Sequence, residues 1–125
     1  MGESFLYLRQ SKKSHMSNKN LPEDFKYLPD MYADQYFPNF LVDKVKSVIK
    51  EAVVFIEEGD HKTEEIQEAF DKMTLNINAL EDEFYENDSE IETGARESIG
   101  ETVQRILEYF EIDIDIEEAI RDRNW

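Results

Sequence analysis

A helical period of apolar residues runs through most of the chain and restricts it to an all-α fold. From Asn39 onward, apolar side chains recur every three or four residues, which places them on one face of an α-helix. The period stops near Gly59 and again near residues 87–90, so the sequence predicts three long helices. We expect a small helical bundle in which these helices pack antiparallel, with short helices at the N-terminal and C-terminal ends of the domain.

Local signals place the ends of the first two long helices. Asn39 is a residue type that caps helix starts, and Gly59 readily adopts the left-handed conformation that ends a helix. The second helix is predicted from a cap at Thr63 to about Glu86. Its apolar stripe consists of Ile66, Phe70, Met73, Ile77, Leu80 and Phe84. The regular steps of this stripe predict one continuous helix.

The third long helix and a short last helix both start with a capping pattern. Ser89 and Glu92 form a capping box, in which each side chain satisfies a backbone donor at the helix start. The third helix is expected to fade near Phe110. Asp115 and Glu118 repeat the pattern for a short helix that ends at the last residue of the chain.

Residues 21–40 form an aromatic strap that we expect to lie over the core. Pro29 suits the first turn of a short helix at about Asp30 to Gln35. Pro38 ends that helix, because the residue before a proline is pushed out of the helical region. A pocket for a small apolar ligand is a candidate beside the strap, although core packing is the favoured interpretation of its rings. The candidate pocket residues are Tyr32, Tyr36, Phe37 and Phe40.

The composition changes near residue 20. The chain has a formal net charge of −16, yet residues 1–20 carry four basic side chains and one acid, so the remaining 105 residues carry −19. Residues 1–20 lack an apolar period and are predicted to be a disordered or loosely docked basic tail. They are either a native extension or residues left by cloning. Residues 21–125 are predicted to form a single helical domain.

The negative charge restricts the partners of this domain. It repels phosphate backbones and anionic lipid surfaces, so we expect no nucleic-acid binding and no membrane attachment, and any charged partner should be basic. No segment reaches the roughly 18 unbroken apolar residues of a membrane span. The chain has no cysteine, which excludes disulfides and thiolate chemistry.

Acidic residues at the end of the second predicted helix break a local rule. The acids from Glu81 to Glu86 would stand at the negative pole of that helix, where anions are destabilising. Such a conflict often marks a functional surface, so we hypothesise an acidic docking face for a basic protein. The competing interpretation is a solvated face that keeps the protein soluble. The candidate partner-binding residues are Glu81, Asp82, Glu83, Glu86, Asp88 and Glu90.

The sequence contains few of the residue patterns that an enzyme active site or a metal site requires. The two histidines, His15 and His61, are too few for the paired-histidine metal motifs, and no nucleophile has a recognisable partnered base. His61 is expected to be an exposed turn residue. The acids at residues 113–118 lack the spacing of a calcium loop, and helix capping is the preferred explanation for them. We expect no enzyme, no metal and no cofactor.

Most basic residues of the domain are predicted to support helices rather than to form a binding patch. Acid-to-base pairs at i and i+4 stabilise helix surfaces by a few tenths of a kcal/mol each. The predicted pairs are Glu68 with Lys72, Glu92 with Arg96, Glu101 with Arg105, and Glu117 with Arg121.

Three separated segments share a recognisable residue pattern. The first contains Asp30, Met31, Tyr32, Tyr36, Phe37, Pro38, Phe40, Leu41, Val42, Asp43, Lys44 and Val45; the second contains Ser89, Glu90, Ile91, Glu92, Thr93, Ala95, Arg96 and Glu97; the third contains Asp115, Ile116, Glu117, Glu118, Ile120, Arg121 and Trp125. Over residues 27–125 this pattern resembles an uncharacterised family of small bacterial domains of unknown function. The resemblance implies a bacterial cytoplasmic domain that excludes the first 20 residues, and it implies no activity.

Together these patterns favour a non-enzymatic module that binds a basic partner through its acidic face. Small acidic helical proteins that neutralise nucleases, such as bacterial immunity proteins, offer an analogy of fold and charge. The alternative is a small-ligand or metal-binding sensor built on the strap or on residues 113–118. The helical stripes would serve a monomer or a homodimer equally well.

Overall fold

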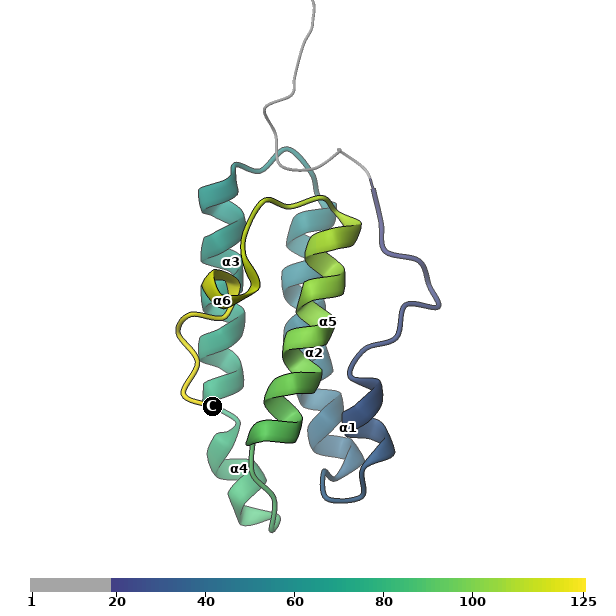
Figure 1. Ribbon diagram of the computed structural model, residues 1–125, viewed down its shortest axis with the longest axis vertical. Helices are drawn as coiled ribbons and strands as arrows, with labels where there is room; N and C mark the ends of the chain where they lie inside the picture. Colours follow the sequence, from purple (N-terminus) through teal and green to yellow (C-terminus); the bar gives the residue numbers. More distant parts are fainter. Residues whose placement is uncertain (1–18) are drawn as a thin grey trace, which may run out of the picture.

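The structure is a bundle of helices. A computed structural model describes residues 19–125, and in this range every regular element is a helix (Figure 1). This confirms the predicted all-α class for the part of the chain that is described. The helices are α1 (Pro29–Ala33), α2 (Asn39–Glu57), α3 (Thr63–Asn78), α4 (Glu81–Glu86), α5 (Thr93–Tyr109) and α6 (Ile116–Ala119).

The long helices α2, α3 and α5 run along the length of the molecule. In Figure 1, α2 runs from the bottom of the view to the top, α3 returns to the bottom, and α5 runs to the top again. α2 packs against α3, α1 packs against α2 and α5, and α6 lies against α3 and α5. The buried apolar side chains of these elements form one continuous core.

The turn between α2 and α3 follows its sequence signals closely. Gly59 has a φ of 82°, so the prediction that it ends the first long helix is confirmed. The cap of α3 is Lys62, one residue earlier than the predicted cap at Thr63, so Thr63 is the first residue of the helix. The Glu65 carboxylate accepts a hydrogen bond from the Lys62 N–H at 2.9 Å, and this bond lowers the pKa of Glu65.

The predicted continuous helix from Thr63 to Glu86 is wrong, because it breaks after Asn78 into α3 and α4. At the break, the Leu80 N–H donates to the Ile77 carbonyl at 2.9 Å, a tight three-residue turn in place of the α-helical bond. The break leaves Phe84 fully buried, so the apolar pattern continues across it. Apolar spacing alone therefore could not reveal where the helix ends.

The predicted capping box of the third long helix is also wrong. α5 begins at Thr93 with Glu92 at its cap, and no side chain caps it. Ser89 instead closes α4: Asp88 adopts a left-handed conformation with φ 60°, and the Ser89 N–H donates to the Phe84 carbonyl at 2.9 Å. The Ser89 hydroxyl is buried and has no hydrogen-bond partner.

The short helices at the two ends are present but shorter than expected. α1 spans Pro29–Ala33, and α6 spans Ile116–Ala119 and ends before the C-terminus. The Asp115 carboxylate accepts from the Glu117 N–H at 3.0 Å, which confirms its predicted capping role.

A buried hydrogen bond fixes the chain where it enters α1. Leu28 is fully buried and has a left-handed φ of 54°, which is unusual for a bulky residue. Its N–H donates to the Thr102 hydroxyl of α5 at 3.0 Å. The strap is therefore tied to α5 at this point as well as packed against it.

Both ends of the described chain are docked. Lys19 donates to the Tyr109 carbonyl at 2.7 Å, and the Tyr109 hydroxyl donates to the Asn20 carbonyl at 2.8 Å. The rest of the predicted basic tail lies outside the described residues. At the other end, Trp125 is buried, and Arg96 donates to its carbonyl at 2.7 Å. None of the helices within residues 19–125 combines the length and apolarity needed to cross a membrane.

Candidate functional site

The predicted acidic docking segment lies on α4 and the loop that follows it. The break after Asn78 places Glu81, Asp82 and Glu83 in the first turn of α4. Anions are favoured at a helix start, where unpaired N–H groups face them. The conflict with the helix dipole that motivated the docking hypothesis is therefore absent.

Two of these acids have structural partners. Glu83 forms an ion pair with Lys44 of α2, with 2.6 Å between carboxylate and amine. Glu81 accepts a hydrogen bond from the Asn124 side chain at 3.2 Å. These contacts connect α4 to α2 and to the C-terminal segment. The remaining candidates, Asp82, Glu86, Asp88 and Glu90, are exposed.

The structure brings one strap residue to the acidic segment. Tyr36 lies beside Glu90 and Glu92, and desolvation together with these carboxylates raises the pKa of its hydroxyl. Phe37 is buried and lies 3.8 Å from the position that a side chain on Gly94 would take, whereas Phe40 is 49% exposed. The strap rings therefore occupy different environments, and their role as a ligand pocket stays a prediction.

Tyr32, the remaining strap candidate, donates its hydroxyl proton to Asp43 of α2. Burial and this carboxylate raise the pKa of Tyr32 from 10.0 to about 12. A pKa that is higher in the folded state contributes stability that is complete below about pH 10 and is lost as the pH rises towards 12. We expect Tyr32→Phe to flatten this alkaline loss, and a spectrophotometric tyrosinate titration should then lack its latest step. An unchanged titration would contradict the assignment.

The acids at residues 113–118 do not gather into a cation site. Asp115 caps α6, and Glu117 pairs with Arg123 at 3.2 Å. Across residues 19–125, no three histidine or carboxylate side chains lie close enough together to hold a metal ion. The metal-binding form of the sensor hypothesis therefore has no support in this part of the chain.

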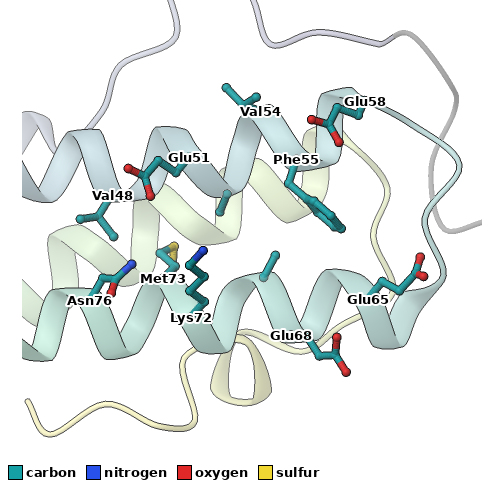
Figure 2. Close-up of a pocket in the computed structure, with 12 residues that line it drawn as sticks. Val48, Glu51, Val54, Phe55, Glu58, Glu65, Glu68, Lys72, Met73 and Asn76 are labelled. Atoms are coloured by element: carbon teal, nitrogen blue, oxygen red, sulfur yellow. The ribbon is translucent and has the colours of Figure 1, made fainter.

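A groove that the sequence did not reveal lies between α2 and α3 (Figure 2). Its volume is about 390 Å³. Apolar side chains from both helices line the space between them, and Figure 2 shows Phe55 and Met73 pointing into it. The apolar lining residues are Val48, Ala52, Val54, Phe55, Ala69 and Met73.

Acidic side chains border this groove on both helices. Glu51 extends from α2 and Glu58 from the residue that caps its end, Glu65 and Glu68 extend from α3, and all four are exposed. Among residues 19–125, Lys72 is the single basic residue that lines the groove, and its amine extends towards α2 in Figure 2. The groove thus combines an apolar floor with a border that carries an excess of negative charge.

A stacked pair of rings includes Phe55, one of the residues that line the groove. His61 lies parallel to Phe55, with 3.7 Å between ring centroids, and its Nε2 donates to the Phe55 carbonyl at 2.8 Å. The His61 nitrogens also lie 3.7 Å from Glu58 and 3.6 Å from Glu65. His61 is only 17% exposed, so the prediction of an exposed turn residue is wrong. Its stacking holds Phe55 in place.

None of the four predicted i, i+4 ion pairs is formed, although all eight residues are described. The arginines make contacts between elements instead. Arg121 of the C-terminal segment pairs with Asp71 of α3 at 2.8 Å, and Arg105 of α5 donates to the Lys26 carbonyl of the strap at 3.1 Å. Glu68 and Lys72, which both line the groove, likewise do not form an ion pair with each other.

The sequence pattern of a described protein family matches residues 21–125, which is most of the chain. The chain belongs to the family of unknown function DUF5713. The match confirms the resemblance to an uncharacterised family. No curated protein and no solved structure matches the chain.

The DUF5713 match contains all the sites described above. The groove, the acidic segment and the strap lie inside residues 21–125, and residues 1–20 lie outside the match. The groove was missed in the sequence because it depends on how two helices pack. One signal was available: acids flank the apolar stripe at Glu51 and Glu58, at a spacing of two helical turns.

Proposed function

We propose that this protein is a non-enzymatic binding module that engages a basic protein partner through the groove between α2 and α3. One observation carries the proposal: an apolar floor is bordered by exposed glutamates on both sides, and Lys72 is the single basic lining residue in the described part of the chain. Apolar contact supplies affinity, and the glutamates select a basic partner.

The charge of the whole molecule supports the same partner class. A net charge of −16 attracts a basic protein from a distance and accelerates the encounter, and it repels nucleic acids and anionic membranes. A basic nuclease, as bound by bacterial immunity proteins, is one partner of this kind, by analogy only. We also propose, as the family resemblance implies, that the protein is bacterial and acts in the cytoplasm.

The acidic segment from Glu81 to Glu90 becomes the second choice for docking. Glu81 and Glu83 have contacts inside the fold, and the acids of the first turn of α4 suit their helix position. None of the residues from Glu81 to Glu90 lines the apolar groove between α2 and α3. Its exposed acids contribute to the general attraction of a basic partner.

A small-ligand sensor is the alternative function. The groove volume of about 390 Å³ falls within the range of small-molecule sites. The charge of the border restricts such a ligand to a cationic amphiphile. A rise in melting temperature with such ligands, but with no peptide, would favour this alternative.

The proposal is tested by selecting peptides from a displayed random library against the full chain. We expect the selected peptides to combine Lys or Arg with apolar residues. Changing Glu51, Glu58 and Glu68 to Gln should weaken their binding at least about tenfold, because three favourable charge contacts are lost. Glu65 is left intact because it caps α3.

The matched control removes three negative charges from the acidic segment between Glu81 and Glu90 instead of from the groove. Glu81→Gln, Asp82→Asn and Glu86→Gln should change peptide binding less than about twofold. A loss confined to this control would move the docking site to α4. Selected peptides without basic residues, or no selected peptides, would reject the proposed function.

A further inference from the structure

We propose that the occupant of the groove is a single amphipathic α-helix that carries Lys or Arg along its flanks. This inference rests on the proposed function and specifies the form and charge pattern of the partner. The shape of the groove, the spacing of its border charges and the position of Lys72 support such an occupant.

The groove follows the axes of two packed helices. On α2 the floor residues Val48, Ala52 and Phe55 are spaced by four and three residues, and on α3 the floor residues Ala69 and Met73 are four apart. Such rows form ridges with a furrow between them, and a third helix packs into this kind of furrow. An extended strand would leave its backbone hydrogen-bonding groups unpaired here, because α2 and α3 offer no free backbone partners along their middle turns.

The α2 border repeats at a helical spacing. Glu51 and Glu58 are seven residues apart, or about 10 Å along the helix axis. A docked helix with basic residues seven apart on one flank would face both glutamates, as in charge pairing between coiled-coil helices. The exposed Val54 adds an apolar edge between them.

The α3 border gives the docked helix a direction. Glu65 and Glu68 lie towards the end of the groove that is nearer the turn between α2 and α3, and Lys72 lies further along α3. The flank facing α3 should therefore be basic near Glu65 and tolerate an acid opposite Lys72. This asymmetry separates the two possible orientations of the helix.

A helix from another protein is favoured over a second copy of this chain and over the N-terminal segment of the chain itself. A second copy of this groove would bring two acidic borders together, which is repulsive. Residues 5–13 of the chain, FLYLRQSKK, combine apolar and basic side chains and are the other occupant with suitable chemistry. They lie outside the described residues, and the experiment distinguishes them by changing their apolar side chains at constant charge.

The experiment uses two synthetic peptides of equal composition, each about 15 residues of Leu, Ala and Lys, or roughly 22 Å as a helix. One places Leu at i, i+4, i+7 and i+11 with Lys beside it, and the other alternates Leu and Lys. Calorimetric titration of the full chain should give binding that is at least about tenfold tighter for the helical pattern. Lys72→Glu should tighten this binding severalfold, a gain that loss of folding cannot produce.

A steric variant tests the location. Ala69→Phe should weaken binding at least about tenfold by filling the floor, whereas Leu75→Phe, at an exposed α3 position outside the groove, should leave it unchanged. Far-UV circular dichroism verifies that both variants are folded.

The outcomes separate this inference from the proposed function. Equal binding of the two peptides would reject the helical form of the occupant but would not reject the proposed basic partner. Binding of neither peptide would reject both. Tighter peptide binding after changing Phe5, Leu6 and Leu8 to Ser in the full chain, which leaves the net charge unchanged, would identify residues 5–13 as the occupant and overturn the inference.

Discussion

Replacing Phe84 with Ala should lower the free energy of unfolding by about 3–5 kcal/mol, the usual cost of emptying a phenylalanine site in a core. Phe84 is fully buried, and it is the only residue of α4 that is. Its carbonyl also accepts the N–H groups of Asn87 and Ser89, which close the helix. Urea unfolding followed by far-UV circular dichroism measures the change.

The neighbouring residue provides a matched control. Tyr85 is 73% exposed on the same short helix, so Tyr85→Ala should change the free energy of unfolding by no more than about 0.5 kcal/mol. A loss below about 1 kcal/mol for Phe84→Ala would mean that α4 is not an integral part of the folded unit.

Replacing Thr102 with Val should cost about 1–3 kcal/mol of unfolding free energy, because the buried N–H of Leu28 loses the hydroxyl that accepts its hydrogen bond. Valine has nearly the same shape as threonine, so the change removes a hydroxyl without emptying space. Leu28 cannot turn this N–H to water, since the residue is fully buried. Urea unfolding again provides the measurement.

A second buried threonine is the control for this change. Thr74 donates its hydroxyl proton to the Phe70 carbonyl within α3 at 2.8 Å. That carbonyl lies in the middle of α3 and keeps its own helical bond, so Thr74→Val should cost less than Thr102→Val. Equal costs for the two variants would contradict the importance of the Leu28 hydrogen bond.

Much of the fold could be predicted where local rules decide the outcome. The apolar period specified α2, and Gly59 specified its end, because glycine adopts a left-handed φ without strain. The break before α4 could not be predicted, because Phe84 keeps the apolar period on both sides of it. The end of α4 was hidden as well, since Asp88 takes the left-handed position usually held by glycine.

The candidate site was predicted less well than the fold. The hypothesis about Glu81 to Glu86 assumed a helix end where the structure has a helix start, and this reverses the expected electrostatic effect. The groove depends on the packing of α2 against α3. Val48 and Phe55 belong to the apolar period that begins at Asn39, which predicts burial, yet both are only partly buried and line the groove. An apolar stripe that is too wide for the neighbouring helix to cover indicates a groove of this kind.

The buried C-terminal residue gives the protein an optical reporter of its own. Trp125 is the only tryptophan in the sequence and is 6% exposed, so its intrinsic fluorescence arises from one defined environment. Circular dichroism averages over all helices, whereas the emission wavelength of this indole follows the docking of the last residues alone. Comparing the two signals during unfolding would show whether the C-terminal segment detaches before the bundle opens.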